Sequence, residues 1–103
     1  MRRPKEAIIA DIRFLYKIAS SSSASNARED MKSFENAVGE LASSSIGDKT
    51  LYRVGKNYYL TMDGVYEVIK ERGEYIVREV RNPKNHTDPL KTLDDVRLAL
   101  SEF

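Results

Sequence analysis

The first residues whose types could carry out proton transfer are a histidine and a nearby carboxylate. His86, the single histidine, stands shortly before Asp88 in the proline-flanked segment NPKNHTDPLK, residues 82–91. A histidine near a carboxylate is the minimum for acid–base catalysis. However, the chain has no cysteine that it could activate and no serine in a recognisable nucleophile elbow. We therefore expect His86 to be a surface residue without a catalytic role, and we expect the chain not to be an enzyme.

The sequence also gives no pattern for a metal ion or a cofactor. Metal sites need several histidine, cysteine or carboxylate ligands at short, regular spacings, and here the carboxylates are scattered. A phosphate-binding loop needs glycines clustered just before a helix. Gly55, Gly64 and Gly73 are instead spread along the chain, where each fits a turn between strands. We expect neither a metal nor a cofactor.

The length and composition are typical of a single globular domain spanning residues 1–103. Hydrophobic residues make up 41% and charged residues 32% of the chain, and the net charge is only +1. This charge balance is far from that of a strongly basic nucleic-acid-binding protein. No apolar run approaches the roughly 20 residues that span a bilayer, and a chain without cysteine fits a reducing compartment. We therefore expect a soluble, cytoplasmic domain with no membrane partner.

Three segments show the apolar spacing of amphipathic helices: residues 5–20, 26–43 and 92–103. Their apolar stripes are Ile8, Ile12, Leu15 and Ala19; Ala27, Met31, Phe34, Val38 and Leu41; and Leu93, Val96, Leu100 and Phe103. Ser25 or Asn26 suits the N-cap of the second helix, and Thr92 with Asp95 has the spacing of a capping box. We expect the first two helices to form an antiparallel hairpin inside the domain, although such stripes also suit helix pairing between subunits.

Residues 50–81 have the composition of an antiparallel sheet with four strands. Gly55-Lys56 fits a type II′ turn and Asp63-Gly64 fits a type I′ turn. Glu71-Arg72-Gly73 fits a three-residue loop that places Lys70 opposite Glu74. The alternative two-residue loop would oppose Glu71 and Glu74 and force a positive φ on Arg72. The sequence thus predicts an α+β fold, a helical hairpin followed by a four-stranded meander and a last helix, in the order ααββββα.

A helix over residues 62–72 is the alternative to this meander. Met62, Val65, Tyr66 and Ile69 have helical spacing, and Gly73 could end such a helix. The run YYLTMDG, residues 58–64, resembles the Y-x-L-T-x-x-G run at the junction of wing and helix in many winged-helix regulators. This resemblance implies a regulator that binds double-stranded DNA. The meander explains more of the sequence, because it gives every strand a partner that is adjacent in the chain.

The turns predict which side chains share a face of the sheet, because alternate residues of a strand point to opposite sides. The face expected to form the core holds Leu51, Tyr58, Leu60, Met62, Val65, Ile69, Tyr75 and Val77. On the other face Tyr52 is expected opposite Tyr59, and Tyr66 opposite Arg78.

This second face gives the predicted interaction surface, which consists of Tyr52, Tyr59, Tyr66, Lys70 and Arg78. Tyrosines beside cations can stack the bases of single-stranded nucleic acid. Tyrosine is also enriched in contacts with protein partners or with a second copy of the chain. A helix that covers the face would instead make the tyrosines part of the core. We therefore predict a non-catalytic binding module, with a winged-helix DNA-binding regulator as the alternative.

Overall fold

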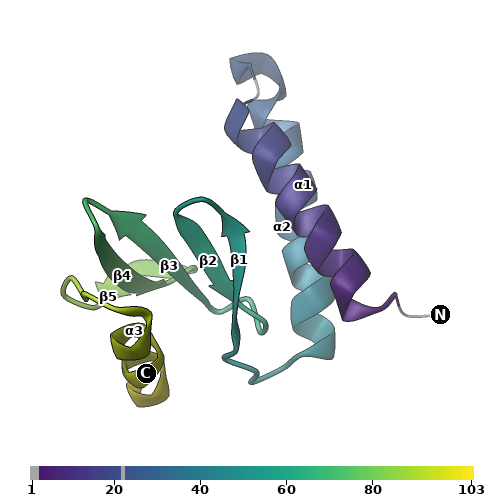
Figure 1. Cartoon of the computed structure of the whole chain (residues 1–103). Coiled ribbons are helices and arrows are strands. Elements are labelled where there is room, and N and C mark those ends of the chain that lie inside the picture. Colours follow the sequence, from purple (N-terminus) through teal and green to yellow (C-terminus); the bar gives the residue numbers. More distant parts are fainter. Residues whose placement is uncertain (1–2, 22) are drawn as a thin grey trace.

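The computed structural model describes residues 3–21 and 23–103, apart from the side chains of residues 24 and 25. In chain order its elements are α1 (Lys5–Ser21), α2 (Ala24–Ser44), β1 (Leu51–Gly55), β2 (Tyr58–Thr61), β3 (Tyr66–Glu71), β4 (Glu74–Glu79), β5 (Asn82–His86) and α3 (Leu93–Glu102). The α+β fold is confirmed: two N-terminal helices pack together, an antiparallel meander follows, and a helix ends the chain (Figure 1). The meander has one strand more than the sequence predicted.

The helical hairpin forms as expected from its apolar stripes. Ile12 of α1 and Leu41 of α2 are buried, with Phe34 beside them. Helix α2 begins at Ala24, whereas the sequence predicted a start at residue 26. Its N-cap is therefore Ser23 and not Ser25 or Asn26. Only part of the hairpin lies against the sheet, and its connecting end projects well beyond the strands (Figure 1).

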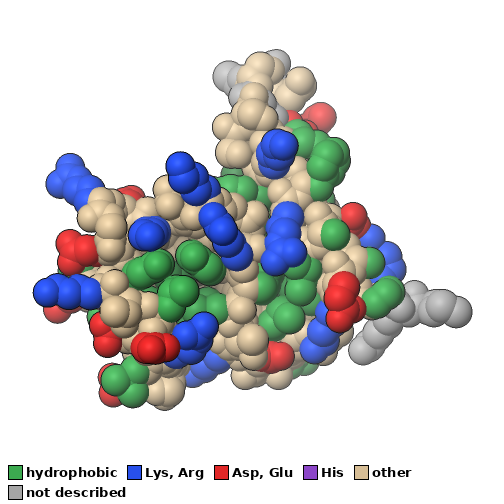
Figure 2. Space-filling model, viewed as in Figure 1, with side chains coloured by type: hydrophobic (Ala, Val, Ile, Leu, Met, Phe, Trp, Pro, Cys, Tyr) green, Lys and Arg blue, Asp and Glu red, His purple; other side chains and the backbone are tan. Residues whose placement is uncertain are grey.

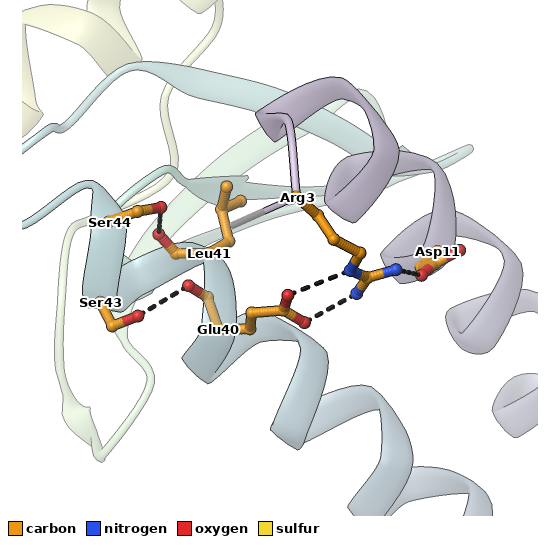
Figure 3. A network of polar contacts seen from close by, with 6 residues as sticks. All are labelled: Arg3, Asp11, Glu40, Leu41, Ser43 and Ser44. Carbon is orange, nitrogen blue, oxygen red and sulfur yellow. Dashed lines mark hydrogen bonds and ion pairs between the residues drawn. The ribbon is translucent and has the colours of Figure 1, made fainter. Parts of the chain in front are cut away.

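Arg3 ties the start of the chain to both helices of the hairpin (Figure 3). Its guanidinium donates two hydrogen bonds to the carboxylate of Glu40 on α2, over 3.1 and 2.7 Å, and it also pairs with Asp11 on α1. This hydrogen bonding lowers the pKa of the Glu40 carboxyl below its ordinary value of 4.5. A bidentate arginine–carboxylate pair fixes geometry as well as charge, so Arg3 links the start of the chain to both helices at this end.

Residues 66–71 form strand β3, so the helix of the winged-helix alternative is wrong. Leu60 pairs with Glu67, which is the register that Asp63-Gly64 predicts. The turn itself is wider than the predicted two residues, because the strands stop at Thr61 and Tyr66. Asp63 shapes it by accepting a hydrogen bond from the backbone of Val65 over 3.0 Å, and Gly64 has a φ of 69°.

Strand β5 lies outside residues 50–81, the span predicted for the sheet, so the predicted end of the sheet is wrong. The strand pairs antiparallel with β4 at one edge of the sheet. Its sequence includes Pro83, which has no N–H to donate and is confined to edge strands in sheets. All five of its residues are exposed. The segment NPKNH shows no apolar alternation, and no glycine marks a turn before it, so the sequence carries no strand signal here.

The predicted register is wrong by one residue in two hairpins. In the first, Tyr52 pairs with Leu60 and not with Tyr59, and Gly55 lies at a bulge without the positive φ that a type II′ turn requires. In the second, the two-residue loop forms: Glu71 pairs with Glu74, and Arg72 has a φ of 52°. Tyr66 is consequently opposite Glu79 and not Arg78.

A one-residue slip exchanges the faces of a strand, so the predicted face assignments are mixed. The helical hairpin packs on the face that carries Tyr52, Tyr58 and Leu60. Helix α3 packs on the opposite face; the residues of that cluster are Leu51, Tyr59, Tyr66, Val68, Tyr75, Val77, Leu90, Leu93, Val96, Leu100 and Phe103. The sheet is therefore the middle layer, and each of its faces is covered over only part of its area (Figure 1).

Candidate functional site

The structure does not bring the five predicted surface residues together. Tyr52 and Arg78 lie on the face that the hairpin covers, whereas Tyr59, Tyr66 and Lys70 lie on the α3 face. The two groups are separated by the thickness of the sheet. They cannot form the single surface that the sequence predicted.

Tyr52 is a core residue beneath the hairpin. Its side chain is only 7% exposed, and burial raises the pKa of its hydroxyl above the ordinary value of 10.0. Its hydroxyl has no hydrogen-bond partner among the described residues. An interaction with an outside partner would require the hairpin to move away.

Arg78 is engaged by residues of its own face. Its Nε donates to the carboxylate of Glu67, which is the residue directly opposite it on β3. The same carboxylate accepts a hydrogen bond from the Tyr58 hydroxyl over 3.0 Å. Burial, and then the negative charge of Glu67, raise the pKa of Tyr58. Polar groups that are buried in a sheet need hydrogen-bond partners, and this network supplies them to Glu67.

Tyr66 packs beneath the C-terminal end of α3. Its ring centroid lies 5.0 Å from that of Phe103. It is partly buried against the cluster around Val96 and Leu100. This contact makes Tyr66 part of the core between the sheet and α3.

Tyr59 and Lys70 remain on the part of the α3 face that the helix leaves open. Tyr59 stands against Tyr75 of β4 with ring centroids 6.3 Å apart in an edge-on arrangement. The ammonium group of Lys70 lies 5.3 Å from the centre of the Tyr75 ring. Arg53 of β1 is exposed and directly opposite Tyr59. Tyr75 itself is buried, with 9% of its surface exposed, and it supports the Tyr59 ring from within the sheet. We call Arg53, Tyr59 and Lys70, together with the buried Tyr75 that backs them, the open sheet face.

Cations lie beside the residues of this open sheet face. Figure 2 shows hydrophobic side chains over the sheet with Lys and Arg side chains around them, and Asp and Glu side chains at the left and lower left of the same patch. The acidic residues of β3 and β4 near Lys70 point to the other side, because Glu71 pairs with Glu74 and alternates with Lys70 along the strand. The strand register thus separates cations from carboxylates at this end of the sheet.

A groove lies on the opposite side of the molecule, between α2 and two turns of the sheet. Its volume is about 680 Å³, and its walls include Phe34, Val38, Tyr58, Val65 and Val80. Glu35, Asp63, Glu79 and Arg81 add charges of both signs. The groove is mainly apolar, and its charged groups do not single out one kind of ligand.

The structure places His86 at an edge of the sheet, apart from any group of potential metal ligands among the described residues. His86 is exposed on β5, where its Nδ1 lies 2.8 Å from the carbonyl oxygen of Thr87. Within residues 3–21 and 23–103, no three histidine, cysteine or carboxylate side chains are grouped as ligands of a metal ion. No helix in that part of the chain is both long and apolar enough to cross a membrane.

The comparisons with known proteins assign neither a family nor a function to this chain. No protein-family model matches this chain, and neither a curated protein nor a solved structure is significantly similar to it.

Sequence reasoning missed two residues of the open sheet face, Arg53 and Tyr75. The signal for Tyr75 was the two-residue loop of the β3–β4 hairpin, whose register places Lys70 opposite Tyr75. That loop was considered less favourable because of the φ it imposes on Arg72. Arg53 was missed because Gly55-Lys56 suggested a regular turn in place of the bulge that the structure has.

Proposed function

We propose that this domain is a non-catalytic binding module that takes single-stranded nucleic acid on its open sheet face. The observation that carries the proposal is the edge-on pair of Tyr59 and Tyr75, flanked by the ammonium group of Lys70 and by exposed Arg53. Proteins that bind single strands combine aromatic side chains, on which bases stack, with cations along the backbone path.

The kinds of side chain support nucleic acid over other anionic partners. An acidic protein would be attracted by the cations alone, whereas a base also gains from a half-buried ring such as Tyr59. The ring of Tyr59 is held by Tyr75, so little side-chain freedom is lost when a base stacks on it. The small number of cations favours a short contact, with a few nucleotides on the face.

The test is a titration of fluorescently labelled single-stranded DNA and RNA oligonucleotides, followed by anisotropy. Tyr59→Leu keeps an apolar side chain against Tyr75 but removes the aromatic ring, and should weaken binding by about 5- to 150-fold. Lys70→Gln should weaken it less. Lys32→Gln, on the helix that packs against the other face, should leave it unchanged. If about three phosphates are neutralised, log affinity should fall with log salt at a slope of about −2.

Two outcomes would count against the proposal. Failure of every oligonucleotide to bind at low salt would remove it. Equal affinity for an acidic peptide, with no loss in Tyr59→Leu, would show that the face is a protein-binding surface driven by charge. In both cases circular dichroism and thermal unfolding of the variants would first establish that they are folded.

A further inference from the structure

A second concave feature lies where α1 crosses the turn between β1 and β2. It is a depression of about 310 Å³ lined by Arg13, Arg53, Val54, Gly55 and Lys56. Three of these five residues are cations, and none is acidic. They come from α1, from β1 and from the turn, so residues far apart in the sequence converge on one place.

The two arginines are fixed by the backbone of the turn. Arg13 donates its Nε–H to the carbonyl oxygen of Arg53 over 2.7 Å. Arg53 donates from Nε to the carbonyl oxygen of Gly55 over 3.0 Å and from Nη2 to that of Lys56 over 3.2 Å. A guanidinium has five N–H donors, so these bonds orient both side chains and use only part of their donor capacity.

Gly55 allows this arrangement because α1 comes very close to the turn. A Cβ atom at Gly55 would lie 2.7 Å from the Tyr16 ring, closer than real contacts permit. The glycine therefore lets α1, with Arg13 on it, approach the β1–β2 turn. The resulting convergence of three positive charges is unfavourable by itself, and an anion between them would relieve the repulsion.

We propose that this depression binds a phosphate group, as the subsite that holds the backbone of a strand lying on the open sheet face. The proposal rests on the function proposed above and names the part of the ligand that this end of the surface recognises. A depression of 310 Å³ is several times the roughly 30 Å³ that one water takes up, and so has room for a tetrahedral oxyanion with some of its water.

The depression lies close enough to the open sheet face for one bound strand to contact both. Arg53 lines the depression and is also directly opposite Tyr59 in the strand register. Side chains that face each other across an antiparallel pair are about 5 Å apart at Cβ. The Arg53 guanidinium is held at the turn end of this pair, so a phosphate bound there lies on the turn side of Tyr59, and the strand continues from it toward the Tyr59 ring. The phosphate can belong to the interior of a strand or to its end, and both present the same oxygens to the cations.

The experiment is an NMR titration of the full chain with inorganic phosphate, followed by unlabelled oligonucleotides with and without a terminal phosphate. Phosphate alone should shift the amide signals of Val54, Gly55 and Lys56 most strongly. Lys56→Gln, a change at an exposed side chain, should weaken phosphate binding by about fivefold, the effect of one charge near 4 Å in water. Arg72→Gln, in the neighbouring turn outside the depression, is the matched control and should leave it unchanged.

The results separate this subsite from the proposed function. Oligonucleotide binding at Tyr59 without phosphate shifts at residues 54–56 would overturn the subsite and leave the function standing. Phosphate binding without oligonucleotide binding would keep the subsite and remove the function. Equal weakening by Arg72→Gln and Lys56→Gln would overturn the subsite as well, because it would show a general response to charge. Tighter binding of only the terminally phosphorylated oligonucleotide identifies a strand end as the source of the phosphate.

Discussion

The ammonium group of Lys49 lies 5.5 Å from the centre of the Tyr66 ring. From this position it donates hydrogen bonds to the carbonyl oxygens of Leu100 and Phe103, each over 3.0 Å. A cation at the C-terminal end of a helix is favoured by the helix dipole, and by the carbonyl groups there that have no intrahelical partner. Lys49 thus connects the segment before β1 to the far end of α3.

Replacing Lys49 by Met should therefore destabilise the docking of α3. The methionine keeps an apolar stem against Tyr66 but donates no hydrogen bond, so we expect a loss of about 1–2 kcal/mol in unfolding free energy. Urea denaturation gives the value, and hydrogen exchange should show that α3 loses protection first. Lys91→Met, at an exposed position before the same helix, is the control and should stay within about 0.5 kcal/mol of the parent.

Phe34→Ala should cost about 3–5 kcal/mol, as expected for a buried aromatic residue. The Phe34 ring packs between the hairpin and the sheet, with ring centroids 5.6 Å from Tyr16 and 6.5 Å from Tyr58. Phe14 is 63% exposed on α1 and provides the matched substitution. If Phe14→Ala proves as costly as Phe34→Ala in thermal unfolding, the exposed side of the hairpin must be buried in solution, for example against a second copy of the chain.

Arg72→Asn should stabilise the domain by about 0.5–1 kcal/mol. Arg72 and Gly73 both have positive φ, the conformation of a type I′ turn, and asparagine tolerates it better than arginine. The urea midpoint should rise without a change in the denaturant slope. Lys56→Asn, in a turn position where φ is not positive, should bring no comparable gain. A loss of stability in Arg72→Asn would indicate that the arginine side chain has a role of its own.

Acid should weaken the Arg3–Glu40 contact. Hydrogen bonding by Arg3 lowers the pKa of Glu40 in the folded state, so the contact stabilises the fold above the unfolded-state pKa and is lost as pH falls below it. Stability measured from pH 6 downward should begin to decline near pH 5. Glu40→Gln should make that decline shallower, whereas Glu29→Gln, exposed on the same helix, should alter it less. Identical pH profiles for Glu40→Gln and the parent would contradict this account.

The helices and the meander could be predicted because their signals are local. Apolar residues at helical spacing placed α1, α2 and α3 within a few residues of their observed ends. The Thr92 side chain accepts a hydrogen bond from the backbone N–H of Asp95, as its capping spacing predicts. These features depend on neighbours in the chain, which the sequence shows directly.

The registers of the β1–β2 and β3–β4 hairpins could not be predicted from their turns, because distant packing outweighs the turn preferences. The observed β3–β4 register costs a left-handed Arg72, about 1–2 kcal/mol, and opposes two glutamates. It also pairs Val68 with Val77, and both are completely buried under α3. Burying two such side chains contributes about 3–6 kcal/mol, which exceeds the turn's cost. The predicted interaction surface depended on the predicted registers. In the observed registers its residues lie on two faces of the sheet.

The order of the strands in the sheet is the same as their order in the chain. Each strand therefore finds its partner across a short loop, and the two N-terminal helices also meet across a short connection. Domains whose contacts are mostly local fold quickly, because little chain entropy is lost before each contact forms. We expect the meander to assemble one hairpin at a time, and the slowest step to be the docking of the helical hairpin and of α3 onto its two faces.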